Sequence, residues 1–565
     1  MTDANENQMR AGAGTVEKFD VIILGAGING AGLFRDLCLQ DVKCLIVDKA
    51  DFGSGTSAAP SRLIHGGIKY LETGELGLVA QSTLERNLLL RNAPHCVEPL
   101  PTFIPSFSLM KGAFAAIRTL FGSTTAPRSR GAILIKIGLA LYDLYGARHR
   151  VMPKHQFMFR KRALAEMPEV TPRIVAGGIY YDAKISRPER LVWELVRDGL
   201  DASPGSRAAN FTSLLGQQDG VLTFRDPQGA EWQASGGVAV NAAGPWIDHV
   251  NATLGAESKL IGGTKGSHIL LSHPELVKSL KGRMIYFEAD DGRICLVYEY
   301  LGLALVGSTD IKAADPENVR CEDDEIDYFI ASLRSLLPRL RFDRDQIVYA
   351  YSGIRPLPAS DASQPGLISR DHSAPVIEPV ESRPFAIISL VGGKWTTFRG
   401  FAEEVADTIL ARIGKARAKS TQMLAIGGGR DFPIDDATRK TWIAGRATST
   451  GLAPQRIAVL LARYGTTADP VMNHICDGAG DAELTHVPGY SVAEIDWIAR
   501  TEMVEHLADI VMRRTTLAIE GRLSAEALDE ISRVAAAELG WSEEKRTEEV
   551  AAVSAHLQRF NRVHL

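Results

Sequence analysis

Three glycines near the N-terminus have the spacing that lets a backbone approach a phosphate. The run GAGING at residues 25–30 follows an apolar segment at 20–24 and precedes a helical pattern over 31–39. A second apolar segment ends in Asp48, about 20 residues after the turn, which is the context that supports such a glycine motif. The amides of a helix N-terminus attract phosphate, and a following acid can accept from ribose hydroxyls. The pattern therefore predicts a dinucleotide-binding βαβ unit.

Two further segments end in small residues at positions suited to a ligand. The apolar run 237–241 leads into Ala-Ala-Gly244-Pro, and the run 385–390 leads into Gly392-Gly393 before a helix predicted over 400–413. In an open α/β sheet, ligands bind beyond the carboxyl ends of the strands, where small residues allow a close backbone approach. Either turn is therefore suited to a ligand, and the Gly392-Gly393 turn before a helix is a second backbone turn that can bind an anion.

These turns require a sheet of parallel strands with helices on its faces. Residues 260–350 instead read as several short strands with one or two helices, and the chain beyond Gly427–Gly429 is almost wholly helical in pattern. The predicted fold class is therefore α/β: a Rossmann-like dinucleotide-binding domain, a mixed β-sheet substrate domain and an all-α C-terminal domain. Within the helical part, Arg513-Arg514 fits the end of a helix. The expected boundaries are a disordered leader at 1–16, a discontinuous dinucleotide-binding domain at about 17–110, 170–250 and 347–415, a substrate domain at about 251–346, and a helical domain at 430–565.

Bulk composition excludes several classes of protein. A net charge of -5 over 565 residues gives no reason to expect nucleic acid as a partner. The six cysteines have neither CxxC nor zinc-ligand spacing, so reduced thiols and no metal are expected. No segment has the roughly 18 uninterrupted apolar residues of a membrane span.

Residues 111–165 are locally basic in an otherwise acidic chain. They contain 11 Lys or Arg and one acid, Asp143, interleaved with apolar residues such as Phe114 and Ile133. This mixture suits attachment to an anionic membrane surface. An ordinary solvated face beside buried helices explains it equally well.

The order of motifs resembles the FAD-dependent glycerol-3-phosphate dehydrogenase family. The likeness covers nearly the whole chain after residue 17. Its motifs here are Gly25–Gly30, Thr56-Ser57, Leu63–Gly67, Asn241–Trp246, Lys265–His268, Gly307–Asp310, Tyr351–Leu357, Ser369–Asp371, Gly392–Thr397, Tyr464–Thr466 and Met512–Thr515.

That resemblance implies non-covalent FAD and oxidation of sn-glycerol 3-phosphate to dihydroxyacetone phosphate. Electrons would pass to membrane quinone, or to oxygen in the family's oxidase branch. The protein would then be cytoplasmic and bound peripherally to the cytoplasmic face of the inner membrane, with a homodimer as one form of assembly. The residues expected at FAD are Gly25, Gly27, Asn29, Gly30, Asp48, Thr56, Ser57, His65, Gly66, Gly67, Gly244, Gly392, Gly393, Thr396 and Thr397.

The implied substrate assigns roles to charged residues within these motifs. A dianionic phosphate needs guanidinium or ammonium partners, for which Arg370, Lys69 and Arg355 are candidates. The reacting hydroxyl needs a base, His268, and its developing negative charge needs positive charge from Arg355 or Lys394. Tyr70 and Glu299 complete the residues expected at the substrate.

Several departures from the family pattern keep the substrate open. Lys69 replaces the usual Arg before Tyr70, Pro60 and Arg62 replace Ser and Lys, and Glu299-Tyr300 replaces Pro-Trp. A larger polyol phosphate such as erythritol phosphate therefore competes with glycerol 3-phosphate, with Glu299 or Tyr300 binding the extra hydroxyl. The motifs are also compatible with an oxygen-using oxidase and with a flavin-binding regulatory protein without turnover.

Overall fold

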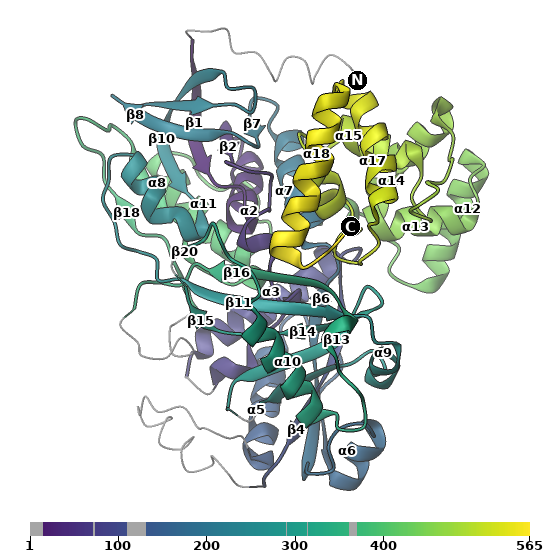
Figure 1. Cartoon of the computed structure of the whole chain (residues 1–565). Coiled ribbons are helices and arrows are strands. Elements are labelled where there is room, and N and C mark those ends of the chain that lie inside the picture. The colour runs from purple at the N-terminus through teal and green to yellow at the C-terminus, as the bar shows by residue number, and fades with distance from the viewer. Residues whose placement is uncertain (1–14, 72–73, 110–130, 290, 314, 361–369) are drawn as a thin grey trace.

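The computed structural model describes residues 15–71, 74–109, 131–289, 291–313, 315–360 and 370–565. The leader expected at 1–16 and residues 111–130 of the basic stretch therefore lie almost entirely outside the described residues. Figure 1 shows two sheets with helices around them and a helical C-terminal part beside both.

The first sheet contains the predicted βαβ unit. Its central pairings are parallel: β1 pairs with β2 and β10, β10 with β19, and β2 with β7. The hairpin β8–β9 and strand β19 both pair with the side of β10 that faces away from β1, and β18 is antiparallel to β19. The strands are β1 (Val16–Leu24), β2 (Cys44–Val47), β7 (Arg207–Ala209), β8 (Ser213–Gln218), β9 (Val221–Arg225), β10 (Glu231–Asn241), β18 (Val376–Ile377) and β19 (Ala386–Ser389).

Three helices lie together on one face of this sheet. Helix α2 (Ile28–Cys38) is buried along almost its whole length because it packs between α7 (Pro188–Ala202) and α11 (Phe398–Arg412). Two glycines allow this close packing: a Cβ on Gly32 would lie 2.6 Å from the Phe398 ring, and one on Gly199 would lie 2.6 Å from the Phe34 ring. The packing fixes the N-terminus of α2 at the sheet edge.

The second sheet is mixed and is built largely from antiparallel pairs. Its order is β15-β11-β14-β13-β12-β4-β6-β3, with β16 on the other side of β11 and β5 beside β6. The strands are β3 (Leu63–Ile64), β4 (Val97–Ser106), β5 (Gln156–Phe159), β6 (Ala176–Ile185), β11 (Thr264–Leu271), β12 (Met284–Glu288), β13 (Ile294–Tyr300), β14 (Leu303–Gly307), β15 (Ile311–Lys312) and β16 (Ile347–Arg355).

This second sheet extends beyond the substrate domain expected at 251–346. Strands β3, β4, β5, β6 and β16 all belong to it, although they lie in or between segments assigned to the dinucleotide-binding domain. The chain crosses between the two sheets several times, and the apolar pattern of a strand does not encode which sheet it joins. The pair β17 (His372–Ser373) and β20 (Val391–Gly392) stands apart from both sheets.

Helices cover both faces of the second sheet. One face packs on α10 (Asp323–Leu336), α9 (Pro274–Leu280) and α6 (Arg160–Glu166), and the other packs on the C-terminal helices. Helices α3 (Leu76–Asn92) and α5 (Ala132–Tyr145) share a small core with Tyr70 and Tyr180. Helix α8 (Ile247–Thr253) follows β10. The C-terminal helices are α12 (Asp436–Thr450), α13 (Pro454–Tyr464), α14 (Ala468–His474), α15 (Val492–Thr501), α16 (Leu507–Asp509), α17 (Ala525–Leu539) and α18 (Glu543–His556).

Candidate active site

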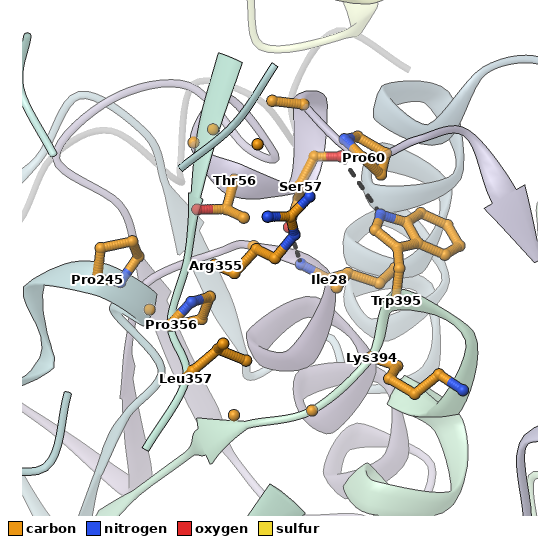
Figure 2. Close-up of a pocket in the computed structure, with 18 of the residues that line it drawn as sticks. Ile28, Thr56, Ser57, Pro60, Pro245, Arg355, Pro356, Leu357, Lys394 and Trp395 are labelled. Carbon is orange, nitrogen blue, oxygen red and sulfur yellow. Dashed lines mark hydrogen bonds between the residues drawn. The ribbon is translucent and has the colours of Figure 1, made fainter. Parts of the chain in front are cut away.

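A cavity of about 1550 Å³ lies where the carboxyl ends of the first sheet meet the second sheet. Its walls come from the first glycine turn, the loop after β2, the turn after β10 and the Gly392-Gly393 turn. Figure 2 labels Ile28, Ser57, Arg355 and Lys394 among the residues that line this space, and they come from different elements. The four segments predicted to face one ligand are therefore brought together.

The first glycine turn leaves no room for side chains. Gly25 has φ +106°, and a Cβ there would lie 2.6 Å from the carbonyl oxygen of Ala242. A Cβ on Gly30 would lie 2.0 Å from the carbonyl oxygen of Gly25. Gly27 caps α2, and Gly27, Ile28 and Asn29 line the cavity. This cradle fits the pyrophosphate of a dinucleotide.

Asp48 lies at the cavity wall with its carboxylate already held by backbone amides. It accepts from the Ala26 N–H at 2.7 Å and from the Ala50 N–H at 3.0 Å. Burial outweighs these bonds and raises the pKa of Asp48 to about 6. The carboxyl group is therefore fixed in the position from which it can accept from ribose hydroxyls.

The hydroxyls of Thr56 and Ser57 bond to the protein as well as facing the cavity. Ser57 Oγ accepts from the Ile28 N–H at 2.9 Å, and Thr56 Oγ1 donates to the Ile354 carbonyl at 2.6 Å. The Trp395 indole donates to the Ser57 carbonyl at 3.3 Å, as the dashed line in Figure 2 shows. These bonds join the loop after β2 to the start of α2 and to the Gly392–Thr397 segment.

The two glycine turns meet although they are far apart in the chain. Asn29 Nδ2 lies 3.5 Å from the Gly392 carbonyl, and the His65 N–H donates to Thr396 Oγ1 at 3.2 Å. Gly392 and Gly393 have φ of +70° and +86°, which favours glycine. The predicted meeting of the His65 loop with the Gly392-Gly393 turn is therefore observed.

Two arginines share one carboxylate at the substrate side of the cavity. Asp310 accepts from Arg355 Nη1 at 3.1 Å and from Arg370 Nη2 at 3.0 Å. Burial and the neighbouring charge of Arg370 lower the pKa of Arg355 to about 10, against the partial compensation from Asp310. With two guanidinium groups to one carboxylate, this corner favours an anionic ligand.

His268 faces the cavity from β11 as a neutral ring. Its Nε2 lies 2.8 Å from Ser61 Oγ, and the ring stacks on Tyr351 with centroids 4.9 Å apart. Burial, followed by the charges of Arg355 and Arg62, lowers the pKa of His268 well below its usual value. Its buried Nδ1 has no hydrogen-bond partner among the described residues. A neutral imidazole in this state can accept a proton.

Lys394 reaches the cavity from the second glycine turn. Its Nζ donates to Ser82 Oγ at 2.8 Å and lies 4.5 Å from the centre of the Tyr70 ring. Burial lowers the pKa of Lys394 to about 7, although the charge of Asp182 opposes this. Burial and the Lys394 charge in turn lower the pKa of His65 to about 3.

Most of the predicted site residues line the cavity. They are Gly25, Gly27, Asn29, Asp48, Thr56, Ser57, His65, Lys69, Tyr70, Gly244, His268, Arg355, Arg370, Gly392, Gly393, Lys394 and Thr396.

Four predicted cofactor residues lie behind the cavity wall. Gly66 donates its N–H to the Tyr142 hydroxyl at 2.8 Å and to Asp182 at 3.0 Å. Gly67, at φ +74°, would place a Cβ against Tyr70 and 2.8 Å from Lys394 Nζ. Gly30 packs inside its turn, and Thr397 is buried at the start of α11. These residues shape the site without lining it.

The prediction that Glu299 lies at the substrate is wrong. Its carboxylate accepts from Lys184 Nζ at 2.8 Å and from the Gly302 N–H at 2.8 Å, and it does not line the cavity. Tyr300 is also turned away, with its hydroxyl bonded to Arg62 at 2.9 Å. Both residues lie at the end of β13, and no pattern in the residues around them indicates which sheet edge that end reaches.

Other side chains at the site were not among the predicted site residues. Asp310 holds both arginines, Ser61 contacts His268, and Asp182 lines the cavity beside Lys394. Asp310 closes the motif Gly307–Asp310, so its position in that motif was an available signal. The pairing of Arg62 with Glu189 at 2.8 Å, fully buried behind the site, had no signal in the sequence.

Comparison with known proteins places this architecture in a family. Residues 20–408 match the family of FAD dependent oxidoreductases, and residues 419–546 match the C-terminal domain of alpha-glycerophosphate oxidase. The chain belongs to the FAD-dependent oxidoreductase family, and its cofactor is FAD. The predicted resemblance, fold class and cofactor are confirmed.

Similar proteins span almost the whole chain. A glycerol-3-phosphate dehydrogenase from Synechocystis is 29% identical over 96% of this chain and 96% of its own length. The aerobic glycerol-3-phosphate dehydrogenase of Bacillus subtilis is 27% identical, over 89% of this chain and 87% of its own. The FAD complex of glycerol-3-phosphate dehydrogenase from Bacillus halodurans shares the fold, with a TM-score of 0.74 at 21% identity, covering 96% of this chain and 95% of that chain.

Replacing Gly25 by Ala should prevent FAD binding. The new Cβ would meet the Ala242 carbonyl in a backbone conformation that L residues rarely adopt. We expect purified Gly25→Ala protein to lack the flavin absorbance of the wild type. The matched control is Gly77→Ala in α3, where a Cβ meets nothing within 4 Å and FAD content should be unchanged. Stoichiometric FAD in Gly25→Ala would contradict the assignment.

Proposed function

We propose that this protein oxidises sn-glycerol 3-phosphate to dihydroxyacetone phosphate and passes the electrons to a quinone. The observation that carries the proposal is the convergence of Arg355, Arg370, Lys394 and His268 on one cavity beside the Gly392-Gly393 turn. Relatives named glycerol-3-phosphate dehydrogenase that align along almost the whole chain support the substrate.

The cations divide between the two ends of such a substrate. Arg370 and Lys69 line the cavity and suit the phosphate dianion, with Asp310 holding Arg370 in place. Arg355 is bonded to the same Asp310, and its charge also lowers the pKa of His268. Arg355 therefore lies next to both Asp310 and His268, and this position suits the substrate carbon that carries the hydroxyl.

Proton removal falls to a group that is neutral in the free protein. His268 is neutral and lines the cavity, so it is the candidate base for the hydroxyl proton. Arg355 and protonated Lys394 stabilise the negative charge that develops on the oxygen. Bound FAD supplies the acceptor for the hydride. An anion bound beside Arg355 would offset the part of the lowering of the His268 pKa that comes from the Arg355 charge, while the larger part, due to burial, would stay.

A four-carbon polyol phosphate is the second candidate substrate. Lys69 lines the cavity where the family usually has Arg, so a fork-shaped donor is replaced by a point charge. Tyr286 and Glu288 also line the cavity, and they take the place of Glu299 and Tyr300 as the candidates for binding an extra hydroxyl.

Anaerobic flavin bleaching by each compound tests the substrate proposal. We expect glycerol 3-phosphate to reduce the flavin faster than erythritol phosphate and unphosphorylated glycerol. His268→Asn should slow reduction about 10²–10⁴-fold while FAD stays bound. Glu299→Gln, outside the cavity, is the control and should behave as the wild type. Faster reduction by erythritol phosphate would establish the second candidate. An absence of reduction by every phosphate would instead favour a flavin-binding protein without turnover.

The pH dependence of kcat/KM tests the role of Lys394. Its pKa of about 7 lies below the usual value of 10.5, so its positive charge is lost as pH rises through about 7. We expect kcat/KM to fall over that range. In Lys394→Arg the positive charge persists above pH 7, so the fall in kcat/KM over that range, the descending limb of the pH profile, should disappear. A limb that survives in Lys394→Arg, or a kcat/KM that rises through pH 7, would contradict the role.

We also propose that α5 attaches the protein to the cytoplasmic face of the inner membrane. Ile133, Ile137, Leu141 and Leu144 are 39–68% exposed, while the opposite face of α5 packs on the core shared with Tyr70. Basic residues lie nearby at Lys136, Arg148, Lys154, Lys161 and Arg162, and Figure 1 shows α5 and α6 at the same end of the molecule. This combination suits an anionic bilayer surface. None of the described helices is long and apolar enough to span a bilayer.

Sedimentation with anionic liposomes at low salt tests this attachment. The double variant Ile137→Ser/Leu144→Ser should lose most of its binding, because these side chains would enter the bilayer interface. The matched control is Met423→Ser/Ile434→Ser, at positions that are 54% and 72% exposed outside α5. If both double variants bind like the wild type, α5 is an ordinary solvated helix.

Peroxide release in place of quinone reduction would establish an oxygen-using oxidase.

A further inference from the structure

The loop between β2 and the helical turn at Thr56–Ala58 has two faces. Its residues Asp48, Lys49, Ala50, Ser54 and Gly55 line the cavity. Between them, Asp51 is fully buried and does not line the cavity. Contacts of Asp51 on the side away from the cavity can therefore fix the position of the cavity wall.

Two consecutive arginines of the C-terminal helical domain hold Asp51. The carboxylate accepts from Arg513 Nε at 2.7 Å, from Arg514 Nη1 at 2.7 Å and from Arg514 Nη2 at 2.9 Å. Asn210 Nδ2 donates the fourth bond at 3.0 Å. The arginines end the helical segment that α16 begins, so the predicted helix terminus is correct. Their side chains bond to a residue outside the helical domain.

A second set of buried bonds joins the same regions. Arg514 also donates to the Glu502 carbonyl at 2.9 Å, and the Glu502 carboxylate accepts from Arg190 of α7 at 2.6 Å. Asn210 donates to the Met503 carbonyl at 2.9 Å. The contact thus links the loop and α7 to the helical domain, and each of the three parts contributes a charged group.

The charges in this contact balance only when all members are present. Asp51, Glu502 and Asp509 face Arg190, Arg513 and Arg514, and each of the three arginines pairs with at least one of these acids. Burial would raise the pKa of Asp51, but the charges of Arg514 and Arg513 lower it below its usual value. Removing one partner would leave a buried charge uncompensated, which is far more costly than losing a surface pair.

The anchored loop connects directly to the glycine turn. The Gly53 N–H donates to the Ala26 carbonyl at 2.9 Å, and the Ala26 N–H donates to Asp48 at 2.7 Å. Phe52 stacks on Trp193 of α7 with centroids 6.1 Å apart, and the Arg514 guanidinium lies 5.3 Å from the centre of the Trp193 ring. A displacement of Asp51 would therefore move Asp48 and the turn.

We propose that Arg513 and Arg514 are positioning residues for FAD, so that docking of the helical domain and binding of FAD stabilise each other. The arginines touch no part of the cavity and act through Asp51 and its loop. Because such coupling is reciprocal, FAD must also tighten the docking of the helical domain. The inference rests on FAD as cofactor and needs no assumption about the substrate.

FAD retention in arginine variants tests the proposal. Holoenzyme is diluted, and the release of FAD is followed by the rise in flavin fluorescence. Arg514→Met should raise the Kd for FAD about tenfold, and Arg513→Met, which leaves the bidentate pair intact, should raise it less. Arg514→Lys should fall between wild type and Arg514→Met, because it keeps the charge but loses the fork.

The control variant is Arg500→Met in α15. Arg500 pairs with Glu538 at 2.8 Å and with Asp496, both inside the helical domain, so the Kd for FAD should stay at the wild-type value. A folded Arg514→Met protein with a wild-type Kd for FAD would overturn the proposal.

Hydrogen exchange of the wild-type protein tests whether FAD binding and docking of the helical domain are coupled, even if the variants do not fold. Removing FAD should increase exchange in peptides covering 48–56 and 502–517, while peptides from α18 keep their protection. Unchanged exchange at 502–517 on FAD removal would show that the helical domain docks independently of the cofactor. No substrate enters either measurement, so a failure here leaves the proposed dehydrogenase activity untouched.

Discussion

The parallel register of three strands is the constraint on which the rest of the structure depends. Leu24 at the end of β1 pairs with Asn241 of β10, which pairs with Ser389 of β19. Because the strands run in the same direction, the turns that follow them all emerge at one sheet edge. The first glycine turn, the Ala242–Gly244 turn and the Gly392-Gly393 turn therefore surround one cavity, although more than half of the chain separates the first from the last.

Concentrated positive charge is the second organising feature, and it is costly until an anion is bound. Arg355 and Arg370 share a single carboxylate, Asp310, and the Nζ of Lys394 is bonded to a hydroxyl rather than to an acid. Burial first, and then the charge of Arg370, lower the pKa values of Arg355 and Lys394, so both groups lose some of their affinity for the proton. The Asp51 contact is the opposite case, because there the buried charges are matched and the pKa of the carboxyl group falls.

Prediction failed where the signal was weak or non-local. Strand β4 was not expected because Pro99, Pro101 and Pro105 interrupt its pattern. It nevertheless lies inside the sheet, between β12 and β6, and the prolines are accommodated because β12 pairs with it only at Thr102 and Phe103. Glu299 was expected at the substrate because its neighbourhood departs from the family pattern, but Lys184 on β6 holds its carboxylate outside the cavity. Strands β6 and β13 are not neighbours in the sheet, so this ion pair depends on how the whole sheet is assembled, which side-chain types alone do not specify.

The sequence by itself determined the local devices. Glycine spacing at 25–30 and the acid at Asp48 are chemical requirements of a dinucleotide, so they can be read without a fold. The family resemblance assigned the Gly392–Thr397 run to the flavin. Only the tertiary structure decided which charged groups meet. The pairing of Arg355 and Arg370 on Asp310, the neutral state of His268 and the attachment of Arg513 and Arg514 to Asp51 join residues dozens to hundreds of positions apart. These electrostatic relations depend on distance and burial, which exist only once the two sheets and the helical domain have packed together.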